Sequence, residues 1–142
     1  MTTYGDYDIC KEEANAFWDT AKMCNEKWNG FPGGILYPLV VNCVFACELY
    51  MKAIIIHDSA NNETRSGHNL NQIFNDLPSS AQKELSNKYK QIYNEELSAL
   101  LDELGNSFIN WRYAYEKGCE INITKIMKFA ETLEEYVSSI NT

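Results

Sequence analysis

The amino-acid sequence predicts an all-α protein in which four to five helices form an up-and-down bundle. In most of the chain, apolar residues recur at alternating spacings of three and four, which is the period of one helix face. Only three prolines and seven glycines occur among the 142 residues, so long helices can run without interruption. No segment alternates apolar and polar residues for long enough to indicate a β-strand. The length fits a single domain, residues 1–142.

The first predicted helix shows this spacing most clearly. Its apolar face consists of Cys10, Ala14, Phe17, Ala21, Cys24 and Trp28. Asp6 and Asp8 place negative charge near its start, where the helix dipole favours it. The segment NGFPGG, residues 29–34, ends the helix, because glycine and proline interrupt helical patterns.

The second predicted helix begins near Pro38 and is apolar on nearly all sides, so its neighbours should cover most of its surface. Residues 35–56 are also long enough to cross a membrane. However, Glu48 and Lys52 lie in the second half of this segment, and charges at that depth are costly in lipid. No basic cluster flanks the segment to orient it. We therefore expect the central helix of a soluble, cytoplasmic bundle and no membrane contact.

A polar and mobile loop is predicted for residues 57–67, followed by a short helix that Pro78 stops. Ser79 and Gln82 have the spacing of a capping box and should start the next helix. The buried edges of these two helices are expected to be Leu70, Ile73, Phe74 and Leu77 in the first, and Ala81, Leu85, Tyr89 and Ile92 in the second.

Two further helical patterns complete the chain. The first continues after a possible break near residues 94–96, ends at Gly118, and has Leu97, Leu101, Leu104, Phe108, Trp111 and Tyr115 on one face. The last helix shows Ile123, Ile126, Ala130, Leu133, Val137 and Ile140 at the same spacing.

The composition narrows the classes of function. A net charge of −8 repels phosphate backbones, so we expect no DNA binding and no non-specific nucleic-acid binding, although a small basic site remains possible. The five cysteines form no CxxC pair, and free thiols in a reducing cytoplasm explain them best. We predict no cofactor and no metal. A zinc site built from Cys43, Cys47 and His57 is the less favoured alternative.

The candidate site is centred on Arg112, one of only two arginines. On a helical wheel, Arg112 lies beside Phe108 and Tyr115. Glu48 and Lys52 are one turn apart on the second helix, where enclosed charges need partners. In one interpretation, Arg112 pairs with Glu48 through two parallel hydrogen bonds and ties two core helices together. In the other, Arg112 faces a groove and binds a phosphate.

His68, at the start of the short helix, also allows two interpretations. It either hydrogen-bonds a neighbouring backbone group or the helix that carries Glu48, or it contacts a ligand in the same groove as Arg112. Tyr113 and Tyr115 could stack on a base, although aromatic residues at this spacing more often belong to a core.

Three segments together resemble the HEPN superfamily of small helical bundles. They are ACELYMKAIII (46–56), GHNLNQIFNDL (67–77) and FINWRYAYEKG (108–118), and they occur in the family's order. The similarity covers most of residues 38–140.

The resemblance implies a comparison with the family's ribonucleases. These use an arginine that is followed four to six residues later by a histidine, meet their copy across a homodimer, and cleave RNA without metal. Arg112 matches that arginine. The positions expected for the histidine hold Lys117, Gly118 and Cys119 instead. A general acid or base works best with a pKa near the working pH, which histidine provides and lysine normally does not.

The sequence therefore favours a non-catalytic HEPN-like module that binds a nucleotide, an RNA end or a protein partner, with no residue assigned as catalytic. The resemblance implies a homodimer and a phage-defence or toxin–antitoxin setting. The ligand-binding residues would be Arg112, Glu48, Lys52, His68 and Tyr115. One alternative is a metal-independent endoribonuclease with an altered motif, in which Arg112 stabilises the transition state. The other is a purely structural dimerisation domain.

Overall fold

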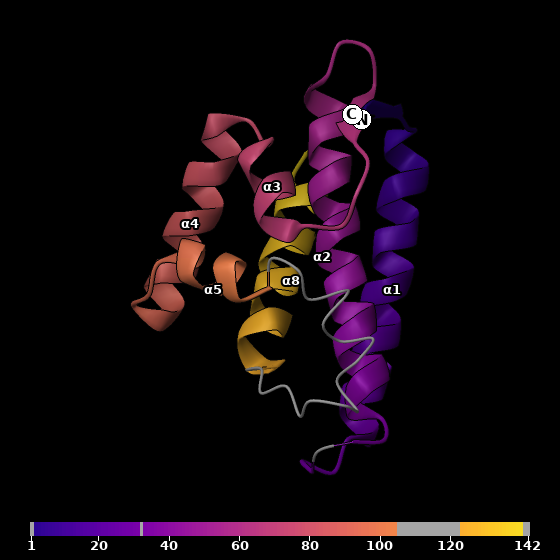
Figure 1. Ribbon diagram of the computed structural model, residues 1–142, viewed down its shortest axis with the longest axis vertical. Coiled ribbons are helices and arrows are strands. Elements are labelled where there is room, and N and C mark those ends of the chain that lie inside the picture. Colours follow the sequence, from indigo (N-terminus) through magenta and orange to yellow (C-terminus); the bar gives the residue numbers. More distant parts are fainter. Residues whose placement is uncertain (1, 32, 105–122, 141–142) are drawn as a thin grey trace.

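The computed structural model of the protein describes residues 2–31, 33–104 and 123–140. Within these ranges it is all-α, as predicted, apart from one two-stranded β-ribbon (Figure 1). The helices are α1 (Tyr7–Lys27), α2 (Leu36–Asp58), α3 (Leu70–Asn75), α4 (Ser79–Tyr93), α5 (Leu97–Leu104) and α8 (Ile123–Ser138). The strands are β1 (Thr2–Tyr4) and β2 (Glu63–Arg65).

Helix α2 is the centre of the fold. It packs along α1 for much of its length and also contacts α8 and α3 (Figure 1). By length and composition it could cross a membrane, yet 67% of its most apolar stretch is buried inside the protein. Neighbouring helices therefore cover most of the apolar surface of α2, as the sequence predicted.

Helix α1 follows the predicted boundaries closely. Asp6 is its N-cap, and the side chain of Asp6 accepts a hydrogen bond of 2.9 Å from the backbone N–H of Ile9. The helix ends at Lys27, before the glycine-rich segment. Its buried residues are Ala14, Trp18, Ala21 and Cys24. Trp18 was absent from the predicted face, whereas Phe17 is only partly buried and packs against Phe45 with ring centroids 5.2 Å apart.

The polar loop predicted for residues 57–67 is formed only in part, and the strand within it was not predicted. Helix α2 extends to Asp58, and β2 then pairs antiparallel with β1, so that Thr3 lies opposite Thr64. The backbone N–H of Gly5 adds a hydrogen bond of 3.0 Å to the carbonyl oxygen of Asn62. Strands of three residues are too short to show a period of two, and the pairing joins segments far apart in the sequence.

The predicted capping box at the start of α4 is wrong. Pro78 is the N-cap, and it makes no side-chain capping bond, while Ser79 is already the first helical residue. The side chain of Gln82 points back toward α3 instead. Its Nε2 donates to the carbonyl oxygens of Asn75 (3.2 Å) and Leu77 (2.9 Å), so it satisfies acceptors at the end of the preceding helix.

The end of α4 and the start of α5 agree with the predicted break at residues 94–96. Asn94 has a φ of 53°, a left-handed conformation that asparagine tolerates at a helix end. Ile92, in the last turn of α4, is 45% exposed, so its predicted burial is wrong. In α8, by contrast, Ile123, Ile126, Ala130, Leu133 and Val137 are buried as predicted. The helical pattern predicted for residues 105–118 lies outside the described residues.

Candidate functional site

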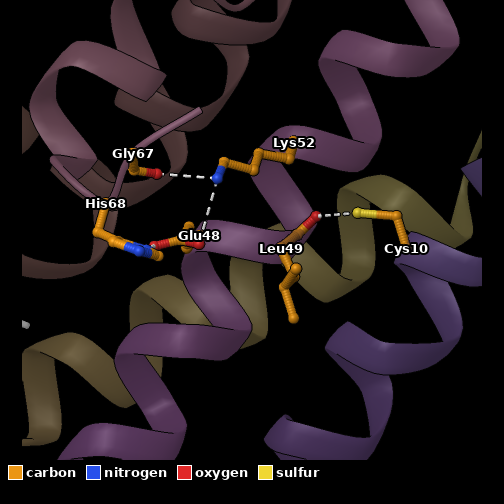
Figure 2. Close-up of polar contacts among 6 residues, drawn as sticks. All are labelled: Cys10, Glu48, Leu49, Lys52, Gly67 and His68. Carbon is orange, nitrogen blue, oxygen red and sulfur yellow. Dashed lines mark hydrogen bonds and ion pairs between the residues drawn. The ribbon is translucent and has the colours of Figure 1, made fainter. Parts of the chain in front are cut away.

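The structure brings together three of the five predicted site residues. Glu48 and Lys52 lie one turn apart on α2, and His68 faces them from the segment that leads into α3 (Figure 2). We call these three residues, together with Gly67, the Glu48 cluster. Arg112 and Tyr115 lie outside the described residues, so the expected pairing of Arg112 with Glu48 stays a prediction.

Glu48 is the buried member of this cluster, with a residue exposure of 4%. Its Oε1 lies 2.8 Å from Nδ1 of His68, and its Oε2 lies 3.3 Å from Nζ of Lys52. Both carboxylate oxygens therefore have partners among the described residues. This arrangement offsets the cost of removing the charge from water.

Lys52 links α2 to the loop that follows it. Its Nζ donates to the carbonyl oxygen of Gly67 at 2.8 Å, in addition to its contact with Glu48 (Figure 2). Gly67 has a φ of 111°, a conformation that favours glycine and that turns this carbonyl toward α2. The side chain of Lys52 is only 14% exposed. Two of its three donors are thus directed at protein acceptors, which limits its capacity to meet a phosphate.

His68 is the solvent-facing member, with a side chain that is 52% exposed. A carboxylate can only accept a hydrogen bond, so the contact with Glu48 places a proton on Nδ1. In the neutral imidazole, Nε2 then carries the lone pair. The next residue, Asn69, is the N-cap of α3 and accepts from the backbone N–H of Gln72 at 3.1 Å. The cap and the buried acid together orient the ring.

Cys10 lies on the opposite side of α2 from His68 (Figure 2), and no sequence motif marked it as a candidate site residue. Its Sγ donates to the carbonyl oxygen of Leu49 at 3.2 Å. Burial raises the pKa of the Cys10 thiol to about 11, and Glu13 contributes in the same direction, while Lys52 acts against them. Cys10 is therefore a protonated, structural thiol at neutral pH rather than a reactive thiolate.

The alternative zinc site is not formed. His57 is exposed in the last turn of α2, where its ring lies 5.1 Å from that of Tyr7, while Cys43 and Cys47 are buried in the core. Burial raises the pKa of Cys47 well above its ordinary value, which opposes metal binding by a thiolate. Over residues 2–31, 33–104 and 123–140, no three His, Cys, Asp or Glu side chains are grouped to hold a metal ion.

The Glu48 cluster can do two things chemically. A histidine held by a carboxylate can hold or transfer a proton at Nε2, and in its protonated form it can donate a hydrogen bond to an anion such as a phosphate. The same contacts also fix the loop and the start of α3 against α2.

Comparison with known proteins gives no match to a family model, to a curated protein or to a solved structure. The resemblance to the HEPN superfamily therefore rests on the three sequence segments alone.

Proposed function

We propose that the protein is a non-catalytic, HEPN-like module that binds a nucleotide or an RNA end through its phosphate. The observation that carries the proposal is the contact of 2.8 Å between the buried Glu48 and the half-exposed His68. A buried acid that orients an imidazole toward solvent is suited to recognising an anion at the surface.

The roles follow from the geometry of the cluster. Glu48 holds Nδ1 of His68 at 2.8 Å, and the half-exposed ring, when protonated, donates a hydrogen bond to a phosphate oxygen. Lys52 is committed to Glu48 and Gly67, so we assign it to positioning rather than to direct phosphate contact. Arg112 supplies the fixed positive charge, and Tyr115 stacks on the base. The role of Arg112 rests on its match to the arginine of the family, and that of Tyr115 on its place beside Arg112 on the helical wheel.

The proposal extends to the setting of the protein. The single domain forms an up-and-down bundle of the HEPN kind, acts in the cytoplasm as a homodimer, and serves a phage-defence or toxin–antitoxin system. A protein partner is an alternative occupant of the same surface. These statements follow from the resemblance of segments 46–56, 67–77 and 108–118 to the family.

A thermal-shift screen of nucleotides and short RNAs tests ligand binding directly. We expect at least one ligand to raise the Tm of the wild-type protein and of His57→Asn, because His57 is the other histidine and lies outside the cluster. His68→Asn and Arg112→Ala should fold but lose the shift. If every ligand that stabilises the wild type also stabilises His68→Asn as strongly, His68 does not belong to the site.

Incubation with structured RNA in the presence of a chelator tests the absence of catalysis. The module should leave the RNA intact, because residues 117–119 provide no histidine. Cleavage that disappears in a folded Arg112→Ala variant would instead establish the metal-independent endoribonuclease.

A structural dimerisation domain is the second candidate, and the bond from Lys52 to the carbonyl of Gly67 favours it. Together with the Glu48–His68 contact, this bond fixes the loop to α2 without requiring any ligand. This candidate predicts that Arg112→Ala lowers the Tm while no nucleotide raises it.

A further inference from the structure

A second part of the molecule, away from the Glu48 cluster, has the features of a binding site. Residues of the second half of α1, its C-cap and the N-terminal part of α8 line a solvent-open cavity of about 340 Å³, here called the α1–α8 cavity. Protein pockets for small ligands begin at about 300 Å³, so this volume suits a small molecule. None of the residues that line the cavity belongs to the Glu48 cluster.

The walls of the cavity are aromatic and apolar. Trp18 and Trp28 contribute indole rings from α1 and its C-cap, while Ile123 and Met127 face them from α8. Trp28 is already held in place, because its Nε1–H donates to the carbonyl oxygen of Phe31 at 2.8 Å. A fixed indole whose donor is occupied offers its ring surface rather than a hydrogen bond, which favours a flat, aromatic ligand.

Positive charge lies at the rim of the same cavity. Lys22 and Lys128 both line it, together with the single acid Glu131, in a chain whose net charge is −8. Nζ of Lys22 lies 5.4 Å from the centre of the Trp18 ring and 3.3 Å from Asp19. Nζ of Lys128 lies 3.3 Å from Glu131.

These ion pairs leave the lysines able to bind a ligand. The side chains of Lys22 and Lys128 are 49% and 38% exposed, and pairs of this kind are weak in water. An incoming anion can therefore contact either ammonium group with little loss of ion-pair free energy. Asn25 and Thr124 add polar groups to the lining.

We propose that the α1–α8 cavity binds a planar aromatic molecule that carries one anionic group. The ring packs against Trp28 and Met127, and the anion lies between Lys22 and Lys128. A carboxylate and a phosphate share this chemistry, so the ligand is either an aromatic carboxylate or a nucleoside monophosphate. This proposal is independent of the phosphate site assigned to His68 and Arg112.

Titration by NMR of the full chain labelled with ¹⁵N tests the proposal. The probes are indole-3-acetate and adenosine monophosphate, with indole-3-acetamide and adenosine as uncharged counterparts, and Trp28→Phe assigns the indole signal. At least one anionic probe should shift the Trp28 Nε1–H signal, and its uncharged counterpart should bind about fivefold more weakly or worse. The probe that binds better identifies the source of the anion.

Charge variants locate the anion. The double variant Lys22→Gln, Lys128→Gln should bind the anionic probe about tenfold more weakly. Lys27→Gln, on the same helix but outside the lining, should bind it like the wild type, as should His68→Asn. Circular dichroism confirms that each variant is folded.

Four results would overturn the proposal. The first is a Trp28 signal that stays unshifted with both anionic probes at roughly 10 mM. The second is equal binding of charged and uncharged probes, and the third is an unchanged affinity in the double lysine variant. The fourth is loss of binding in His68→Asn, because the shift would then report the other site.

Discussion

Glu48 has a buried charge whose partners come from two different parts of the chain. Lys52 approaches from the same helix and His68 from the start of α3. Such a group stabilises the fold only while it is paired, since an uncompensated charge in a core is costly. Three other ion pairs, Lys22–Asp19, Lys90–Glu96 and Lys128–Glu131, lie on exposed surfaces and should matter less.

Glu48→Gln should lower the free energy of unfolding by about 1–3 kcal/mol, because Lys52 is then left enclosed without a counter-charge. Glu96→Gln is the matched control. It removes the same charge from a pair in which Lys90 and Glu96 are 55% and 64% exposed, and it should cost less than about 1 kcal/mol. Urea unfolding of both variants measures the difference. Equal losses would show that the Glu48 cluster contributes no more than a surface pair.

Cys10 should make the stability depend on pH in the alkaline range. Burial raises its pKa from 9.0 to about 11, so the folded state favours the protonated thiol. The stabilisation is fully present below pH 9.0 and is lost as the pH rises through about 11. Between these values the free energy of unfolding should fall less in Cys10→Ser than in the wild type, because serine does not titrate there. Parallel curves for the two proteins would contradict this assignment.

The described helices differ in how far the sequence could predict them. Helices α1, α2 and α8 were predicted within a few residues, because apolar side chains repeat at helical spacing along α1 and α8 and α2 is one long apolar segment. The β-ribbon could not be predicted, since its six residues gain their structure from each other. The direction of the Gln82 side chain could not be predicted either. It depends on the position of the end of α3, whereas the capping-box rule considers only the spacing of residues within one helix.

Gln82 provides a test of how α3 and α4 are joined. Gln82→Ala removes two hydrogen bonds to carbonyl groups at the end of α3 and should cost about 1 kcal/mol of unfolding free energy. Ser79→Ala should cost under about 0.5 kcal/mol, because Ser79 is not the cap. Urea unfolding distinguishes this pattern from a capping box, for which both variants would be destabilising. Gln91→Ala, on the exposed surface of α4, is the control for helix propensity.

At the scale of the whole molecule, a chain with a net charge of −8 has to accommodate one very apolar helix, α2. Helix α2 is surrounded by α1, α3 and α8, while the acidic residues remain mostly on outer faces. The sequence predicted this role from Glu48 and Lys52, and it placed His68 near the helix that carries Glu48. It could not predict the path of residues 59–67, because that path depends on the pairing of β2 with β1 and on the left-handed turn at Gly67.

Homodimerisation is a prediction for the whole molecule that comes from the HEPN resemblance. Size-exclusion chromatography with light scattering should give a mass of twice 16.3 kDa at low micromolar concentration. The exposed apolar residues Ile9 and Met23 on α1 allow a further check. Substituting both with glutamine should leave the dimer intact if the exposed faces of the late helices supply the interface. A mass of 16.3 kDa for the wild-type protein would refute the dimer.

The β-ribbon joins β1, at the start of the chain, to β2, which is far from it in the sequence. Strand β1 holds β2, and β2 ends at Arg65, only a short step before Gly67 and His68. A fusion tag, a protease or a binding protein that pulled β1 away would release one anchor of the segment that carries the imidazole. Events at the N-terminus would then be transmitted to His68 without any movement of the helical core.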